Sequence, residues 1–93
     1  MIWTVRFHHD VESDLLQLGR AEARRILKVV RERIAEGEPD KLGKPLRGVL
    51  AGYRRIRTGD VRIVYRVDGT EIVLVLCGLR RDDEVYEMAC RRV

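Results

Sequence analysis

The sequence predicts a single α+β domain spanning residues 1–93, with the element order β-α-α-β-β-β-α. Two helical segments with apolar stripes follow each other in the first half of the chain. In the second half, the turn signals Thr58-Gly59-Asp60 and Asp68-Gly69 separate consecutive β-prone runs. A chain of 93 residues with 45% hydrophobic residues can bury one modest core but not a second. These observations predict a mainly antiparallel, twisted sheet with a helical hairpin packed on one face.

The first half of the chain predicts a strand and a helical hairpin. Residues 2–8 alternate weakly between apolar and polar side chains, which is typical of a strand. Asp10 is the expected N-cap of a first helix, and Gly19 is expected to end it. A longer helix with an apolar stripe is predicted over about residues 20–36. Because almost nothing joins the two helices, we expect an αα-hairpin.

The second half predicts a loop, a meander of strands and a last helix. Residues 37–44 are expected to form the loop, and a basic β-hairpin follows over residues 53–66. Residues 71–77 are almost continuously apolar, so they are expected to form a central buried strand. A short helix is expected from about residue 82 to Arg92.

The basic hairpin predicts an electropositive face of the sheet. Side chains alternate along a strand, so every second residue of each strand lies on the same face. The helical hairpin is expected to bury one face, which leaves the other face open. The arginines expected to line this open face are Arg55, Arg57, Arg62 and Arg66. Guanidinium groups bind phosphate well, so phosphate is the predicted ligand of this face.

Positive charge is concentrated in the middle of the chain. The formal net charge is +4 and the isoelectric point is about 9.5. Between residues 41 and 66 there are eight cations and one acid. The cations are Lys41, Lys44, Arg47, Arg54, Arg55, Arg57, Arg62 and Arg66. This segregation favours a binding face for an anionic partner over a merely solvated surface.

Several classes of protein are not expected. No apolar run reaches the roughly 18 residues that a membrane span requires, and the N-terminal residues lack the pattern of a signal peptide. Cys77 and Cys90 form no CxxC pair and are expected to be buried free thiols in a reducing cytoplasm. The adjacent His8 and His9 do not form a metal-ligand pattern, so neither a metal nor a cofactor is expected.

Arg80 and Tyr86 are further candidates for a functional site. Arg80 follows the last predicted strand, beside the basic hairpin if that strand pairs with it, and Tyr86 lies six residues on. Taken singly, Tyr86 is better explained as a core aromatic, and Arg80 as an ion-pair partner of Asp82 or Asp83. Their convergence on one cationic face makes a functional interpretation about equally good.

RNA cleavage by its own 2′-hydroxyl is one reaction that such residues can support. It requires a base, an acid and cations that stabilise the charge of the phosphorane. Arginines suit only the last role, because a guanidinium pKa lies above about 12. Tyr86 can act as a base only if neighbouring cations lower its pKa from about 10. The residues therefore predict a weak catalyst that depends on positioning, or equally a nucleic-acid binder without chemistry.

The sequence resembles the RelE/ParE toxin superfamily of bacterial and archaeal type II toxin–antitoxin systems. The resemblance covers nearly the whole chain and is carried by Lys44-Pro45-Leu46-Arg47-Gly48, by the stretch from Gly52 to Tyr65, and by Gly78-Leu79-Arg80 with Val85-Tyr86. The RelE branch implies a ribosome-dependent endoribonuclease that cuts mRNA in the ribosomal A site. The ParE branch implies a DNA gyrase inhibitor. A relative that binds an antitoxin without catalysis is a third alternative.

The resemblance also implies site residues. Arg55 corresponds to a catalytic lysine of RelE-type toxins, Arg62 and Arg80 to catalytic arginines, and Tyr86 to a catalytic tyrosine. ParE-type toxins usually lack this set, so the RelE branch is preferred. This chain departs from the RelE pattern at Tyr53, where the family has a second lysine that acts as base, and Arg54 or Tyr86 is the expected substitute. The residues expected to bind RNA or the ribosome are Lys41, Lys44, Arg47, Arg54, Arg57 and Arg66.

The implied partners are a cognate antitoxin, the RNA of the small ribosomal subunit and mRNA. The antitoxin is expected to wrap the toxin with an acidic or amphipathic segment. The resemblance implies a cytoplasmic protein with no membrane partner.

Overall fold

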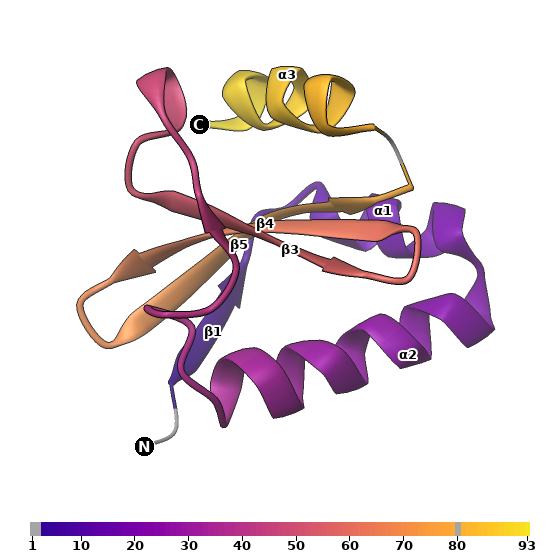
Figure 1. The fold of residues 1–93 in the computed structure, drawn as a ribbon. Coiled ribbons are helices and arrows are strands. Elements are labelled where there is room, and N and C mark those ends of the chain that lie inside the picture. The colour runs from indigo at the N-terminus through magenta and orange to yellow at the C-terminus, as the bar shows by residue number, and fades with distance from the viewer. Residues whose placement is uncertain (1–2, 80) are drawn as a thin grey trace.

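The computed structural model of the chain describes residues 3–79 and 81–93. Its centre is a five-stranded sheet with the order β1-β5-β4-β3-β2 (Figure 1). The strands are β1 (Thr4–Phe7), β2 (Lys44–Pro45), β3 (Tyr53–Thr58), β4 (Val61–Asp68) and β5 (Glu71–Gly78). β1 runs parallel to β5, and all other neighbours are antiparallel. The predicted fold class is therefore confirmed, and the two-residue strand β2 is an addition at the edge.

The helical hairpin consists of α1 (Val11–Leu18) and α2 (Arg20–Val29) and covers one face of the sheet (Figure 1). The predicted helix over residues 20–36 is present, but its turns from Val30 to Ala35 are π-helical. Gly19 joins the two helices with φ +88°, a left-handed value that favours glycine. Among the described residues, no helix is long and apolar enough to span a membrane.

The first core lies between the helical hairpin and the sheet. Ile26, Val30 and Ile34 follow one another at a spacing of four residues and are at most 5% exposed. They pack against buried side chains of the sheet, among them Ile56, Val61, Ile63, Tyr65, Ile72 and Leu74. Burial of each such aliphatic side chain contributes roughly 1.5–3 kcal/mol. The helical and strand periodicities thus determine which faces meet.

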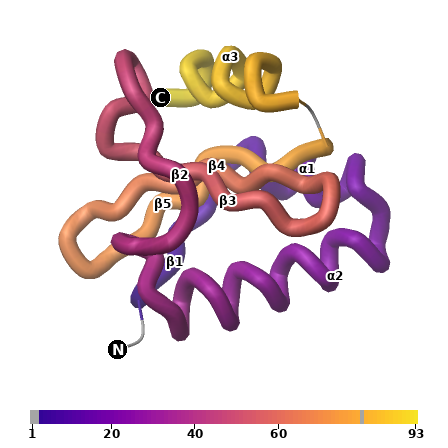
Figure 2. Tube along the Cα trace, in the orientation of Figure 1, coloured from indigo at the N-terminus to yellow at the C-terminus, as the bar shows by residue number. Residues whose placement is uncertain are grey.

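The opposite face of the sheet is open only in part, in contrast to the expectation of an open face. Helix α3 (Asp82–Arg92) lies over it, and the 3-10 turn η2 (Gly48–Leu50) rises beside the helix (Figures 1 and 2). A second core forms between these two elements and the sheet. The part of this sheet face that lies under α3 is apolar, because it covers the apolar side of the helix. Arg55 and Arg62 lie beside the first residue of α3.

A β-bulge in β5 builds the apolar platform under α3. The register between β4 and β5 shifts after Val64, and Val75 is the extra residue on β5. Val75 and the next residue, Leu76, consequently both belong to the second core, where they pack with Val85 and Ala89 of α3. The strand is almost continuously apolar because both of its faces are covered: Ile72, Leu74 and Cys77 belong to the first core, and Val75 and Leu76 belong to the second.

The turn between β3 and β4 is held against α2. Arg25 donates from Nη1 to Thr58 Oγ1 at 2.7 Å and from Nη2 to the Thr58 carbonyl oxygen at 3.1 Å. Glu22 orients this guanidinium through an Nε–Oε1 contact of 2.8 Å. Gly59 opens the turn with φ +61°, as the turn signal predicts. These contacts fix the basic hairpin relative to the helices.

Candidate active site

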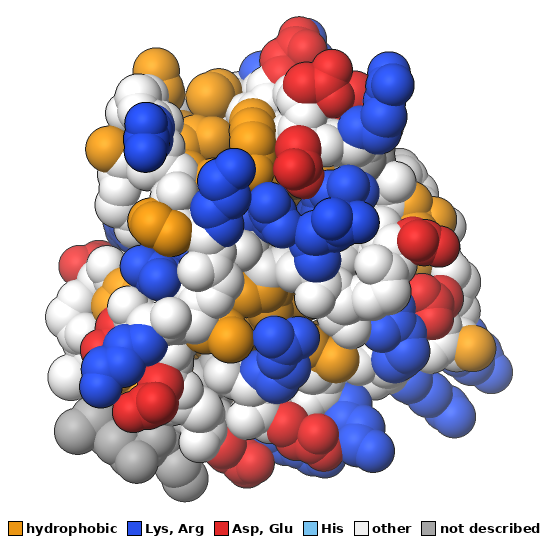
Figure 3. Space-filling model, viewed as in Figure 1, with side chains coloured by type: hydrophobic (Ala, Val, Ile, Leu, Met, Phe, Trp, Pro, Cys, Tyr) orange, Lys and Arg blue, Asp and Glu red, His pale blue; other side chains and the backbone are white. Residues whose placement is uncertain are grey.

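Three arginines project from one face of the β3–β4 hairpin, beside α3. Arg57 lies directly opposite Arg62 in the register, and Arg55 lies opposite Val64. Alternation along each strand therefore places Arg55, Arg57 and Arg62 on the same face, and we refer to these three residues as the arginine cluster. Figure 3 shows a band of Lys and Arg side chains beneath α3, with an acidic side chain at its upper edge.

The carboxylate of Asp82, the first residue of α3, neutralises part of the arginine cluster. Asp82 Oδ2 lies 3.4 Å from Arg55 Nη2, and Arg62 Nε donates a hydrogen bond to Asp82 Oδ1. The side chains of Arg55 and Arg62 are only 13% and 14% exposed, whereas that of Asp82 is 39% exposed. Like charges on neighbouring strands repel, so this shared carboxylate stabilises the arrangement.

The contacts with the arginine cluster lower the pKa of Asp82. Partial burial of the carboxyl opposes its ionisation. The hydrogen bond from Arg62 and the charges of Arg55, Arg62 and Arg57 outweigh this effect, so the pKa of Asp82 lies below its ordinary value. Asp82 is therefore an anion at neutral pH.

Tyr86 lies one helical turn after Asp82, on the same side of α3. Arg55 Nε donates to the Tyr86 hydroxyl oxygen at 3.4 Å. The ring of Tyr86 also packs against the second core, so it is half-buried. Arg55, Arg62 and Tyr86, three of the four predicted catalytic residues, thus lie around one position. The fourth, Arg80, lies outside the described residues.

A groove of about 820 Å³ adjoins Tyr86 on the side of η2. It is lined by Lys44, Pro45, Leu46, Arg47, Val49, Leu50, Tyr86 and Cys90. Lys44 and Arg47, both predicted to bind RNA, therefore border the site through this groove. Cys90 is exposed here, so the expectation of two buried thiols is wrong for Cys90 and confirmed only for Cys77.

The other predicted RNA-binding residues make contacts away from the arginine cluster. Arg54 donates from Nε to the Leu42 carbonyl oxygen at 2.6 Å and thereby holds the loop before β2. Arg66 lies over the ring of Tyr53, with 5.8 Å between its Cζ and the ring centroid. Lys41 Nζ forms a surface pair with Glu38 at 3.5 Å.

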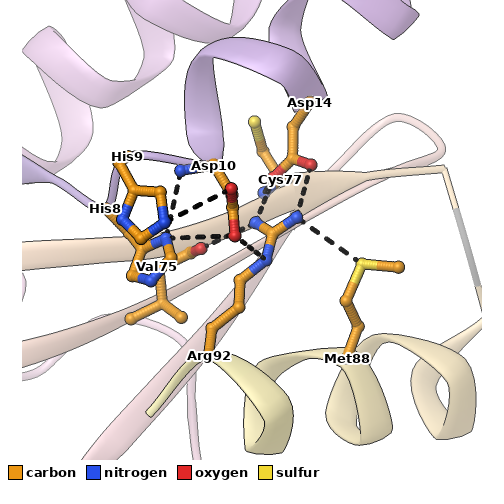
Figure 4. A network of polar contacts seen from close by, with 8 residues as sticks. All are labelled: His8, His9, Asp10, Asp14, Val75, Cys77, Met88 and Arg92. Carbon is orange, nitrogen blue, oxygen red and sulfur yellow. Dashed lines mark hydrogen bonds and ion pairs between the residues drawn. The ribbon is translucent and has the colours of Figure 1, made fainter.

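A second polar network, which sequence reasoning missed, ties the end of α3 to α1 (Figure 4). Asp14 is 8% exposed and accepts hydrogen bonds from two nitrogens of Arg92 and from the Cys77 backbone N–H. Arg92 also donates to the Val75 carbonyl oxygen at 3.0 Å. The signal in the sequence is an acid at residue 14, inside the apolar spacing of the first helix. This network positions α3, and with it Asp82 and Tyr86.

The histidine pair belongs to the same network. His8, His9 and Asp10 bring possible ligand atoms within 4.8 Å of one another. However, His8 Nδ1 accepts the backbone N–H of Asp10 at 3.1 Å, and the Asp10 carboxylate lies 3.8 Å from Arg92 Nε (Figure 4). Asp10 is at the N-cap of α1 as predicted, but its side chain makes no capping hydrogen bond. The Nδ1 atom of His8 and the carboxylate of Asp10 therefore already have partners within the protein.

Comparison with known proteins finds relatives over most of the chain. Residues 5–85 match the model of a family described as the ParE toxin of the type II toxin–antitoxin system parDE. Toxin RelG of Mycobacterium tuberculosis is 37% identical over 90 residues, which cover 92% of this chain and 98% of that protein. The M. tuberculosis toxin–antitoxin complex RelBE2 contains a chain with 32% identity and a TM-score of 0.78, covering 86% of this chain and 100% of that chain. A mutant of the E. coli toxin RelE in the free state has a TM-score of 0.78 with 23% identity, covering 100% and 99% of the two chains, which shows the same fold.

These matches extend over the helical hairpin, the whole sheet and the start of α3. The family match spans most of the chain, and the match to RelG covers nearly all of both proteins. The motifs that carry the resemblance lie inside the family match, except that Tyr86 follows its last residue, Val85. The chain therefore belongs to the RelE/ParE family of toxins of type II toxin–antitoxin systems.

Proposed function

We propose that this toxin is a ribosome-dependent endoribonuclease that cleaves mRNA in the ribosomal A site and so stops translation. The observation that carries the proposal is the convergence of Arg55 and Arg62 on one anionic position beside the Tyr86 hydroxyl. Two guanidinium groups directed at one anion suit a phosphate whose negative charge increases during a reaction.

In the proposed reaction, the 2′-oxygen of a ribose attacks the adjacent phosphorus, and the 5′-oxygen of the next nucleotide leaves. The 2′-hydroxyl gives its proton to a base, and the leaving oxygen takes a proton from an acid. Arg55 and Arg62 stabilise the phosphorane, which carries more charge than the diester. Tyr86 takes part in proton transfer, because its hydroxyl oxygen accepts from Arg55 and keeps its own hydrogen for another partner.

Dependence on the ribosome fits a site that is rich in cations and poor in bases. Holding reactants in the right geometry can lower a barrier by about 7–11 kcal/mol, so a weak catalyst gains most from a partner that positions the RNA. Exposed cations beside the site, such as Lys44, Arg47 and Arg57, suit the phosphate backbones of ribosomal RNA and mRNA. This function places the toxin in the cytoplasm.

A cognate antitoxin is the second proposed partner, supported by the toxin–antitoxin complex of the M. tuberculosis relative. Charge pairs alone are screened over roughly 10 Å at 0.1 M salt, so a stable complex also needs apolar anchors. The outer side of the helical hairpin offers Leu16 and Leu27, which are 75% and 44% exposed, and the end of β1 adds Phe7, which is 49% exposed and lines a groove with Leu27. An amphipathic antitoxin segment can cover these side chains while its acids meet the cations of α2.

The test is cleavage of mRNA by purified toxin with and without ribosomes, with the ends mapped by primer extension. Wild-type protein should cut only ribosome-bound mRNA, and Arg62→Ala should cut much more slowly. Arg80→Ala is expected to behave likewise, on the basis of the family resemblance. Intact mRNA on toxin-bound ribosomes would contradict the proposal.

Inhibition of DNA gyrase is the alternative function, favoured by the match of residues 5–85 to the ParE toxin family. It predicts relaxed plasmids and DNA damage while mRNA stays intact. A supercoiling assay with purified gyrase distinguishes the two activities. A toxin that stops neither translation nor supercoiling, and causes no growth arrest, would be a non-catalytic antitoxin-binding relative.

A further inference from the structure

The carboxylate of Asp82 occupies the position to which Arg55 and Arg62 point. Its two oxygens are shared between them: Oδ2 lies 3.4 Å from Arg55 Nη2, and Oδ1 accepts from Arg62 Nε. A phosphodiester also presents two oxygens and one negative charge, and guanidinium groups bind phosphate and carboxylate in the same geometry. A substrate phosphate that engages both arginines must therefore take the place of this carboxylate.

Asp82 is the partner that can leave this contact, because its side chain is more exposed than those of the two arginines. Arg55 and Arg62 lie on paired strands of the sheet, and their side chains are 13% and 14% exposed. Asp82 is the first residue of α3, and its side chain is 39% exposed. Rotation of this side chain carries the carboxylate into solvent while it stays at the helix N-terminus, where the helix dipole stabilises a negative charge.

We propose that Asp82 is an internal substitute for the substrate phosphate, holding Arg55 and Arg62 toward one point in the free protein and leaving when a phosphodiester binds. Asp82 is thus a positioning residue rather than a catalytic one. That the phosphodiester belongs to mRNA rests on the proposed function. The replacement of the Asp82 carboxylate by an incoming phosphate, which we call the exchange, does not.

The exchange has a measurable consequence for the affinity for anions. In the wild-type protein, a phosphate must displace the carboxylate and then stay close to its negative charge. Asp82→Asn keeps the shape of the side chain and removes the charge, so phosphate meets two arginines without a competing anion. Asp83→Asn is the matched control, because Asp83 is the exposed next residue in the same turn and loses the same charge.

The first experiment titrates inorganic phosphate into the wild-type protein and both variants at pH 7, followed by the NMR signals of the Arg55 and Arg62 side-chain Nε–H groups. Asp82→Asn should bind phosphate about tenfold more tightly than Asp83→Asn, a factor equivalent to about 1.4 kcal/mol. Asp83→Asn should stay within about twofold of wild type, as expected for an exposed charge. Equal affinities of the two variants, or weaker binding by Asp82→Asn, would overturn the exchange.

Asp82→Glu keeps the proposal testable if Asp82→Asn does not fold. The glutamate retains the charge and reaches the same arginines, so its phosphate affinity should match wild type. Tighter binding by Asp82→Glu, to the level expected for loss of the charge, would show that the carboxylate does not compete.

Single-turnover cleavage on saturating ribosomes separates this proposal from the proposed function. Because Asp82 has left the arginines once RNA is bound, any loss of rate in Asp82→Asn should be far smaller than the roughly 100-fold effect of losing a transition-state donor. A roughly 100-fold loss would make Asp82 a catalytic group and overturn its role as a substitute anion. If wild-type toxin cleaves nothing, the proposed function fails, and the phosphate titration still decides the exchange.

Discussion

Arg92, in the last turn of α3, forms a bidentate ion pair with Asp14 of α1. Arg92 Nη1 lies 2.7 Å from Asp14 Oδ2, and Arg92 Nη2 lies 2.9 Å from Asp14 Oδ1 (Figure 4). The side chains are 12% and 8% exposed. The pKa of Arg92 is raised, first by the hydrogen bond with Asp14, against the opposing effect of burial. This pair links two helices that pack on opposite faces of the sheet.

Arg92→Ala should therefore destabilise the protein. Removing one partner leaves the Asp14 carboxylate buried without its counter-charge, which typically costs about 3–5 kcal/mol. Arg91→Ala is the matched control, since the Arg91 side chain is 72% exposed and its ion pair with Glu87 lies at the surface. Its effect should stay within about 0.5 kcal/mol. Urea unfolding measures both, and equal free energies of unfolding for the two variants would contradict the role of the buried pair.

Arg55→Ala and Arg62→Ala should each slow single-turnover cleavage on saturating ribosomes by about 100-fold, the order seen when one preorganised transition-state donor is lost. Affinity for the ribosome should change little, because both side chains are largely buried beside α3. Arg24→Ala, an exposed arginine on α2, is the control and should cleave normally. Unchanged rates in both site variants would remove Arg55 and Arg62 from the active site.

Lys44→Ala should show the opposite pattern. Lys44 is exposed at the rim of the groove beside Tyr86, where it can contact RNA phosphates without touching the reacting atoms. Its removal should weaken ribosome association and reduce the slope of log K against log salt concentration by about one. The cleavage rate at saturating ribosome should stay at the wild-type value. A slower saturated rate with normal affinity would mean that Lys44 acts in the chemical step.

Tyr86→Phe should reduce single-turnover cleavage by at least about 100-fold, the lower range for loss of an acid or base. The substitution keeps the ring in the second core and removes only the hydroxyl that contacts Arg55. Tyr53→Phe is the control, because Tyr53 also packs at the second core but lies beside Arg66. Near-normal cleavage by Tyr86→Phe would leave Tyr86 as a packing residue.

The two cysteines should differ in reactivity. Burial, with a smaller effect of the Asp14 charge, raises the pKa of Cys77 to about 12, whereas Cys90 is exposed. Iodoacetamide at pH 8 should therefore modify Cys90 and leave Cys77 unreacted until the protein is unfolded. Labelling of native Cys90→Ser would contradict this assignment. Because the folded chain keeps the Cys77 proton longer than the unfolded chain, this thiol's contribution to stability should be lost as the pH rises from about 9 toward 12.

The sequence by itself determined the elements and the faces of the basic hairpin. Turn signals at Gly59 and Gly69 define where the strands reverse, and both glycines have positive φ. Alternation predicted that Arg55, Arg57 and Arg62 share a face, because the period of a strand is a local property of the backbone. The buried stripe of α2 follows from helical spacing for the same reason.

Only the tertiary structure decided which elements cover the two faces of the sheet and which distant side chains come into contact. Local patterns do not predict that α3 covers the second face, because its docking depends on the bulge at Val75 and on the pair formed by Arg92 and Asp14, which are 78 residues apart. The same docking brings Asp82 into contact with Arg55 and Arg62. Its negative charge partly neutralises the cationic face that the sequence predicted to be open. Pairing between distant side chains is set by strand register and helix placement, and these are fixed only when the whole core packs.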